Sequence, residues 1–168
     1  FVDGALCMCV SGQCYLSSLL GQRSGNRGLC AQPCRLPFQS PATGHALSLK
    51  DLSLIPRLQQ LRECGVASLK IEGRMKRPEY VAAAVTACRQ ALEGQQPDLE
   101  TLQAVFSRSG FTDGHFTGRR TLAMFGVRQK QDVQAAAGVL KGLEPLYTDP
   151  RRRVQKVEVA MALRMAAG

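Results

Sequence analysis

The chain has 168 residues, of which 45% are hydrophobic and 21% charged, and its formal net charge is +9. This is the composition of a globular protein of one domain or a domain and a half, long enough to fold without disulfide bonds. No stretch approaches the roughly 20 apolar residues of a membrane span, and the amino end lacks the basic start of a signal peptide. We therefore expect a cytoplasmic protein without a membrane segment.

Both ends of the sequence suggest strands, and short elements follow the first one. Residues 1–7 begin without Met and read like a strand entered midway, whereas 157–165 alternate like a strand that has just begun. We expect an internal part of a longer protein. Residues 11–20 can form a short helix, and 21–28 (GQRSGNRG) are a glycine-rich loop.

A helix, a strand and a second helix are predicted next. Leucines on one helical face predict a helix from Leu52 to near Gly65, with Ser48 or Asp51 as its cap. Residues 67–72 (ASLKIE) predict a brief strand. Pro78 stands where a first helical residue belongs, and a helix to Leu92 follows. This order is typical of a parallel α/β sheet.

The second half has weaker signals. Residues 98–108 can form a helix, 109–128 hold four glycines and read as an ordered irregular loop, and 141–153 are a connector.

The positive charge is concentrated in the first half of the chain. Residues 1–78 hold ten Lys and Arg against four Asp and Glu. A basic excess beside a candidate site suggests an anionic partner, most commonly nucleic acid, although solubilising charge is an equal alternative. Arg35 and Lys76 are candidate RNA contacts on this basis. Arg23, Asn26 and Arg27 in the glycine-rich loop could donate to phosphate, but the loop matches no phosphate-binding template.

Five of the seven cysteines lie within 28 residues. Cys7, Cys14, Cys30 and Cys34 have the spacing C-x6-C-x15-C-x3-C, with Cys9 between the first two. Such a cluster, in a chain without secretory features, points to a metal. The isolated Cys64 and Cys88, on helix-like stretches, are expected in the core. If residues 7–9 are a strand, Cys7 and Cys9 point to opposite faces and only one faces the site.

The spacing leaves the kind of metal open. Structural zinc sites prefer paired C-x2-4-C knuckles, and only Cys30 and Cys34 have that form. An iron–sulfur cluster accepts wider spacing because each thiolate binds a different iron. The spacing therefore favours iron–sulfur slightly over zinc, with neither as a third alternative.

A second group of charged residues alternates along the strand predicted at 67–72 and its exit. Lys70, Glu72 and Arg74 could share one face, at a strand end where ligands bind in parallel sheets. An ion-pair network that only holds the strand end is the competing interpretation. Neither His45 nor His115 stands beside a nucleophile motif, so hydrolytic chemistry has little support.

Three segments, in this order, resemble the collagenase-like peptidases of family U32. They are GALCMCVSGQCYLSSLLGQRSGNRGLCAQPCRLPF (4–38), followed by LSLKDL (47–52), and SLKIEGRMKRPEYV (68–81). The resemblance is close over 1–92, and FTDGHFTG with MFG (111–126) is similar to the continuation in longer members. It implies that 1–92 are the C-terminal half of a (β/α) TIM-type barrel, that 93–150 are a helical and loop extension, and that 151–168 lead into a β domain.

The resemblance also implies a function. The four cysteines would bind a 4Fe-4S cluster, and similar members hydroxylate carbon 5 of a pyrimidine in rRNA or tRNA, with prephenate implicated. Others serve quinone hydroxylation. Lys70, Glu72 and Arg74 would orient an anionic substrate or cofactor, since Arg suits a bidentate grip on a carboxylate. Many relatives have His where this chain has Asp3, which puts any role of that position in doubt.

Two alternatives remain beside RNA hydroxylation. The family name suggests a peptidase acting on a peptide substrate, although the chain shows no recognisable nucleophile. A module that binds RNA or protein, stabilised by a cluster or zinc but without chemistry, is the third interpretation.

Overall fold

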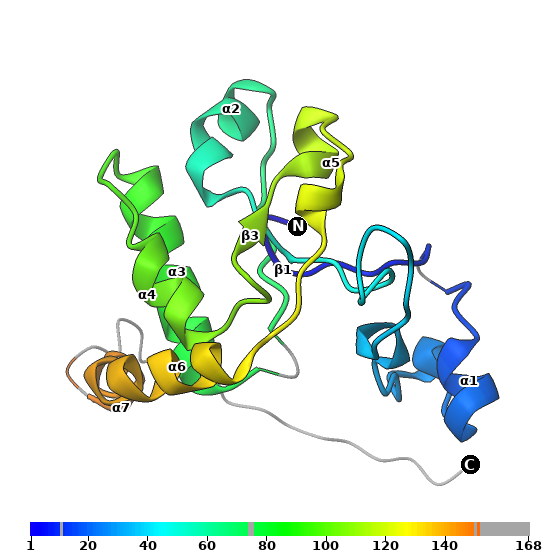
Figure 1. The fold of residues 1–168 in the computed structure, drawn as a ribbon. Coiled ribbons are helices and arrows are strands. Elements are labelled where there is room, and N and C mark those ends of the chain that lie inside the picture. Colours follow the sequence, from blue (N-terminus) through cyan, green and yellow to red (C-terminus); the bar gives the residue numbers. More distant parts are fainter. Residues whose placement is uncertain (11, 74–75, 150, 152–168) are drawn as a thin grey trace, which may run out of the picture.

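The computed structural model describes residues 1–10, 12–73, 76–149 and 151. At its centre is a three-stranded sheet in the order β1-β2-β3 (Figure 1). The strands are β1 (Asp3–Ala5), β2 (Asp51–Ser53) and β3 (Phe111–Thr112). β1 and β2 are antiparallel, whereas β2 and β3 are parallel. The expected parallel α/β sheet is therefore wrong in part, because this small sheet is mixed.

The segment at Ile71 runs along the edge of β1 that does not pair with β2. Ile71 forms a parallel bridge with Asp3, the Val2 amide donates to the Lys70 carbonyl over 2.9 Å, and the Glu72 amide donates to the Asp3 carbonyl over 2.9 Å. The strand predicted at 67–72 is thus confirmed only at its end.

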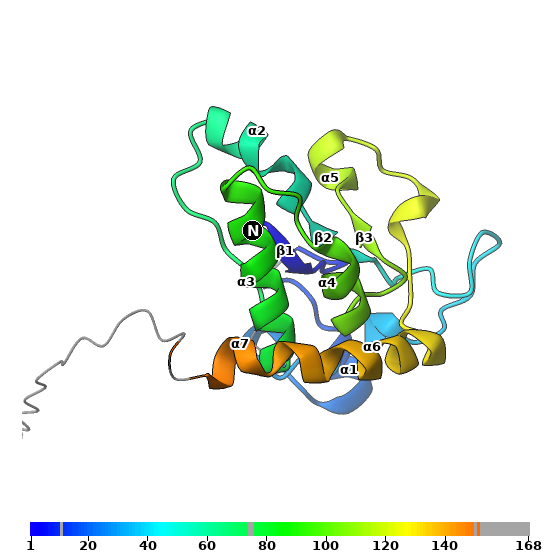
Figure 2. The same cartoon turned by 90° about the vertical axis from the view of Figure 1, so that its left-hand side faces the viewer.

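Four helices pack together beside the sheet. They are α3 (Pro78–Leu92), α4 (Leu99–Val105), α6 (Lys130–Leu143) and α7 (Pro145–Thr148). Helices α3 and α4 lie over the strands, and α6 and α7 run across the ends of α3 and α4 (Figure 2). Local signals fix where they begin. Pro78 occupies the first turn of α3 as predicted, where its missing N–H is not needed. The Asp98 side chain caps α4 by accepting from the Thr101 amide.

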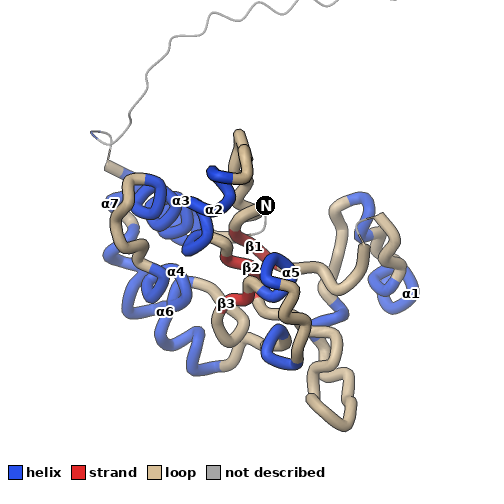
Figure 3. Tube along the Cα trace, turned by 90° about the horizontal axis from the view of Figure 1, so that it is seen from above, coloured by secondary structure: helices blue, strands red, loops and turns tan. Residues whose placement is uncertain are grey.

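The remaining helical elements are short (Figure 3). Figure 1 and Figure 3 both place α1 in a lobe away from α3, α4 and α6. The short elements are α1 (Leu16–Gly21), α2 (Leu58–Glu63), α5 (Gly114–Thr117) and the 3-10 turns Gly25–Arg27, Pro33–Arg35, Ile55–Arg57 and Leu122–Met124. The described residues contain no helix long and apolar enough to cross a membrane.

The helix predicted from Leu52 is wrong over its first half. Asp51 and Ser48 do not cap it: Asp51 lies in β2 and both side chains are buried. Leu52 and Leu54 also fit the period of a strand, and Pro56 lacks the N–H that a continuous helix needs. Only α2, from Leu58 onward, is α-helical.

Other expectations were incomplete. The predicted loop 109–128 contains β3, α5 and a 3-10 turn, and the sequence did not predict α6. The predicted strand at 157–165, like most of 151–168, lies outside the described residues. Three short strands form no closed barrel within the described part of the chain, so the TIM-type barrel stays a prediction.

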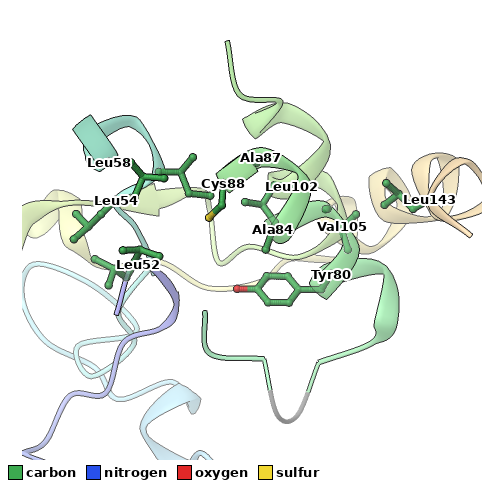
Figure 4. Close-up of a cluster of buried hydrophobic side chains, with 13 residues drawn as sticks. Leu52, Leu54, Leu58, Tyr80, Ala84, Ala87, Cys88, Leu102, Val105 and Leu143 are labelled. Carbon is green, nitrogen blue, oxygen red and sulfur yellow. The ribbon is translucent and has the colours of Figure 1, made fainter. Parts of the chain in front are cut away.

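The core lies between the sheet and α3 (Figure 4). It joins Val2, Leu52 and Ile55 from the first half of the chain to Leu102 and Leu143 from the second. Cys88 is buried here as predicted.

Cys64 is exposed, so its predicted place in the core is wrong. It follows the last residue of α2, where the chain turns at Gly65 with a φ of +80°. The side chain therefore leaves the buried face of the helix.

Candidate functional site

The segment 7–35, which we call the cysteine lobe, lines most of a hollow of about 330 Å³. We call this cavity the cysteine hollow. Its cysteines come from the segment between β1 and α1 and from the loop and 3-10 turn that follow α1. The four predicted ligands all line it: Cys7, Cys14, Cys30 and Cys34. Apolar side chains, including Leu16 and Leu47, complete much of the wall. The structure therefore brings together every cysteine that the spacing singled out.

The cysteine thiols also affect one another. Burial raises the pKa of the Cys34 thiol, Arg35 opposes this shift, and the neighbouring Cys7, Cys30 and Cys14 thiols add to it. A metal that binds the thiolates would remove this mutual repulsion.

Hydrogen-bond donors are arranged around the Cys30 sulfur. The Gln32 amide donates to Cys30 Sγ over 3.3 Å, and the Ser17 hydroxyl lies 3.8 Å from the same sulfur. Ser17 is buried and also accepts from the Ala31 amide, which fixes the loop carrying Cys30. Donors to sulfur tune the potential of cysteine-bound iron–sulfur centres.

Cys9 also lines the cysteine hollow, together with Cys7. The expectation that only one of them faces the site is wrong, because β1 ends at Ala5 and the alternation of a strand does not extend to these residues. Cys7 is among the groups that raise the pKa of Cys34.

The described residues contain no group of three or more His, Cys, Asp or Glu side chains close enough together to hold a metal ion. A zinc site needs its sulfur atoms about 2.3 Å from one point. A cluster instead receives each thiolate at a separate iron, so it needs a wider hollow. The cysteine hollow brings four thiols to one place, and their donor chemistry suits either a zinc ion or an iron–sulfur cluster.

The basic residues of this lobe have different surroundings. Arg35 faces inward, and its guanidinium donates to the carbonyls of Leu6 and Leu49 over 2.6 and 2.7 Å. It ties the cysteine lobe to the sheet. Arg23, Asn26 and Arg27 are exposed, with Arg23 bonded to the Leu29 carbonyl and Asn26 to the Gly12 carbonyl.

A buried ion pair joins β2 to the residues after α4. The amide and guanidinium of Arg108 donate to the two carboxylate oxygens of Asp51, the amide over 3.0 Å. Both side chains are almost fully buried. The second Arg108 nitrogen donates to Gln32 Oε1 over 3.2 Å. Through Gln32, the ion pair therefore connects to Cys30.

Beside this pair is a second cavity of about 290 Å³, which we call the cationic cavity. Gln32, Lys76, Phe106 and Arg108 line it together with Glu72. Lys76 Nζ lies 3.9 Å from Asp51 and over the Phe106 ring. Burial lowers the Lys76 pKa to about 8.

The predicted group Lys70, Glu72 and Arg74 is only partly brought together. Glu72 lines the cationic cavity, but Lys70 is exposed and lies over the Phe1 ring, 4.5 Å from its centroid. Arg74 lies outside the described residues. Sequence reasoning missed Asp51, Phe106 and Arg108, because nothing local marks residues that meet across more than 50 positions.

Asp3 is buried in β1. The Tyr80 hydroxyl donates to Oδ1, and Oδ2 has no hydrogen-bond partner. Burial raises the Asp3 pKa to about 6, and the hydrogen bond from Tyr80 opposes this. Asp3 is thus a carboxyl group held partly protonated near neutral pH.

Comparison with known proteins identifies the family. The model of peptidase family U32 matches residues 1–124. The chain belongs to this family. It is 38% identical to a collagenase of Porphyromonas gingivalis, over 71% of this chain and 38% of that protein. No solved structure matches.

Other U32 relatives are named for RNA modification. The chain is 44% identical to a 23S rRNA 5-hydroxycytidine synthase of Escherichia coli, over 55% of this chain and 16% of that protein. It is 38% identical to a tRNA hydroxylation protein of Bacillus subtilis, over 60% and 27%. The matched part thus spans well under half the length of these relatives.

Proposed function

We propose that this chain is part of an iron–sulfur RNA hydroxylase that acts on carbon 5 of a pyrimidine in rRNA or tRNA. The observation that carries the proposal is the convergence of Cys7, Cys14, Cys30 and Cys34 on one hollow, in a family with RNA-hydroxylating members. The basic first half of the chain is consistent with an RNA substrate.

The four cysteines would hold a 4Fe-4S cluster, with zinc as the alternative. Replacing a ring hydrogen by a hydroxyl is a two-electron oxidation that needs an oxygen donor and an electron acceptor from outside this chain, and a cysteine-bound cluster would supply electron transfer to that acceptor. The donors at Cys30 would tune its potential, and the apolar wall would limit the access of water. We retain prephenate as the candidate co-substrate.

We assign different roles to the polar residues of the chain. The exposed Arg23, Asn26 and Arg27 lie on the cysteine lobe, where they would bind the RNA backbone. Arg35, which is bonded to two carbonyls, would position the lobe rather than grip RNA. Lys76 and Glu72 would face a reactant in the cationic cavity.

Peptide hydrolysis is the second candidate, because a collagenase is among the relatives. Neither His45 nor His115 lines the cysteine hollow or the cationic cavity. The described residues thus place no histidine base beside the cysteine thiols there, which favours RNA hydroxylation over this alternative.

The test is a nucleoside analysis in cells. The full-length gene encoding this chain is expressed in a host that lacks its own RNA-hydroxylating relative, and nucleosides from rRNA and tRNA are measured by mass spectrometry. We expect a 5-hydroxypyrimidine with the unchanged gene, none with Cys30→Ser, and an unchanged level with Cys64→Ser, since Cys64 is exposed and does not line the cysteine hollow. An identical profile with and without the gene would refute RNA hydroxylation, and gelatin cleavage by the purified protein would then support the peptidase.

A further inference from the structure

A second basic surface surrounds α5. Residues 114–124, which form α5 and the 3-10 turn after it, are here called the α5 loop. Figure 1 and Figure 2 both draw α5 well apart from α1, so this surface is separate from the cysteine lobe. The sequence has no Asp or Glu between Asp113 and Asp132, whereas Arg119 and Arg120 lie within this stretch. The α5 loop therefore carries positive charge that its own acids do not balance.

Close packing holds the α5 loop in one shape. A Cβ at Gly114 would lie 2.8 Å from the Arg119 carbonyl and 2.7 Å from Met124 Sδ, so the two ends of the loop meet tightly. Gly118 turns the chain after α5 with a φ of +73°. The Lys50 amide donates to the Met124 carbonyl over 2.8 Å, which ties the loop to the start of β2. Its exposed side chains are thus carried on a fixed backbone.

Two cations from distant segments meet at a hollow in this surface. Lys50 and Arg119 both line a cavity of about 370 Å³, which we call the α5 hollow. Among the residues that the structure describes, neither side chain has a hydrogen-bond or ion-pair partner. Asp113 also lines the hollow, but its carboxylate is held by Arg57 over 3.0 Å. The Thr121 oxygen accepts from a backbone amide, which leaves its hydroxyl proton available to an anion.

Apolar side chains of the α5 loop are exposed as well. Phe116 is 42% exposed and Leu122 is 60% exposed. An aromatic ring that stands in water among basic side chains is typical of surfaces on which the bases of single-stranded nucleic acids stack. The phosphates of the same strand would meet the cations. A small anion would occupy the α5 hollow alone and would make no use of the ring.

We propose that the α5 loop binds single-stranded RNA, with a backbone phosphate at Lys50 and Arg119 and a base stacked on Phe116. Arg120 would meet a neighbouring phosphate. This contact is additional to the one proposed on the cysteine lobe, so the RNA would be held at two separate places. The inference rests on the proposed function only for the choice of RNA as the partner. Binding at the α5 loop needs neither a metal at the cysteines nor a chemical step.

The test is the fluorescence anisotropy of a labelled oligouridylate of about 12 nucleotides, titrated with the full-length protein at several salt concentrations. We expect Arg119→Gln to weaken binding. It should also reduce the slope of log K against log salt by about 0.7, the loss of one phosphate contact. Arg89→Gln is the matched control, because Arg89 is a 75% exposed arginine of α3, and it should change neither quantity.

A second pair of variants tests the stacked base. Phe116→Leu keeps an apolar side chain but removes the ring, so binding should weaken about tenfold while the salt slope stays the same. Phe116→Tyr keeps a ring and should retain the affinity. Polyglutamate is the competitor that carries negative charge without bases, and it should displace the oligouridylate poorly.

Cross-linking tests the same contact in the unchanged protein. An oligouridylate that contains 4-thiouridine is irradiated with the protein, and the attached peptides are identified by mass spectrometry after trypsin digestion. We expect cross-links in residues 109–119, which trypsin releases as one peptide containing Phe116.

Several results would overturn the proposal. They are the absence of binding, equal effects of Arg119→Gln and Arg89→Gln, no effect of Phe116→Leu, equal competition by polyglutamate, and cross-links confined to other peptides. The nucleoside analysis decides the proposed function separately. A 5-hydroxypyrimidine in cells together with unchanged binding by both variants would remove the α5 contact alone, whereas binding at the α5 loop without that nucleoside would remove hydroxylation alone.

Discussion

The Tyr80 hydroxyl, in the first turn of α3, donates a hydrogen bond to the buried carboxyl group of Asp3 in β1. This contact joins the helical layer to the sheet across 77 positions of the chain. The second oxygen of Asp3 is buried without a partner, and burial raises the Asp3 pKa to about 6 from 3.8. The fold therefore favours the protonated form of this acid.

A pH dependence of stability follows from Asp3. Because its folded pKa is above the unfolded value, the folded state retains the proton between pH 4 and 6 while the unfolded state loses it. Below pH 4, Asp3 makes its full contribution to the free energy of unfolding. This contribution, about 3 kcal/mol in all, is lost as the pH rises from 4 through 6.

Asp3→Asn should remove this loss. The free energy of unfolding of the variant, measured in urea, should rise relative to the unchanged protein between pH 4 and 7. Asp98→Asn is the control, because Asp98 is exposed and Asn also caps a helix. Equal pH profiles for the unchanged protein and Asp3→Asn would contradict the assignment.

The buried ion pair predicts a large loss of stability on Arg108→Met. The substitution leaves Asp51 buried with a single backbone donor and a lysine at 3.9 Å, so we expect a loss of about 3–5 kcal/mol. Arg57→Met removes a pair with Asp113 in which both side chains are about a third exposed, and should cost less than about 1 kcal/mol. Comparable losses in urea unfolding would show that Asp51 does not need Arg108.

Gly126 is predicted to tolerate no side chain. A Cβ there would lie 2.3 Å from the Arg108 carbonyl and 2.7 Å from Lys50 Cγ, so Gly126→Ala should cost about 3 kcal/mol or more by thermal unfolding. The matched change Gly138→Ala, within α6 and with open space around it, should gain about 0.5–1 kcal/mol. A neutral Gly126→Ala would mean that the chain after Arg108 can shift freely.

The sequence predicted features whose cause is local. Pro78 marks the start of α3 through its own ring geometry, and the cysteines that share a hollow lie within 28 residues of one another. Asp51 was misassigned as a helix cap because its partner, Arg108, lies 57 positions away. The cationic cavity could not be predicted for the same reason, since Gln32, Lys76 and Arg108 meet only in the folded chain.

The α6 helix was missed for another reason. Its apolar residues recur at helical spacing but are mostly Ala among Gly and polar residues, and its start depends on a capping box formed by Gln129 and Asp132. Gln is a weak signal for a helix start compared with Ser or Asp.

The cysteine hollow predicts different roles for two neighbouring thiols. Cys7→Ser should reduce the iron content of the anaerobically purified protein, whereas Cys9→Ser should leave it unchanged, because the proposed ligand set contains Cys7 and not Cys9. Loss of iron with Cys9→Ser and not with Cys7→Ser would exchange their roles.

The most direct test of the central claim is metal and sulfide analysis of the protein purified without oxygen, together with its visible spectrum. If the cysteine hollow holds a 4Fe-4S cluster, the protein should contain about four iron and four acid-labile sulfide per chain and show a broad absorption that Cys30→Ser abolishes. Cys64→Ser, the exposed cysteine outside the hollow, should leave both unchanged. One zinc per chain without iron, or a spectrum unaltered by Cys30→Ser, would contradict the account.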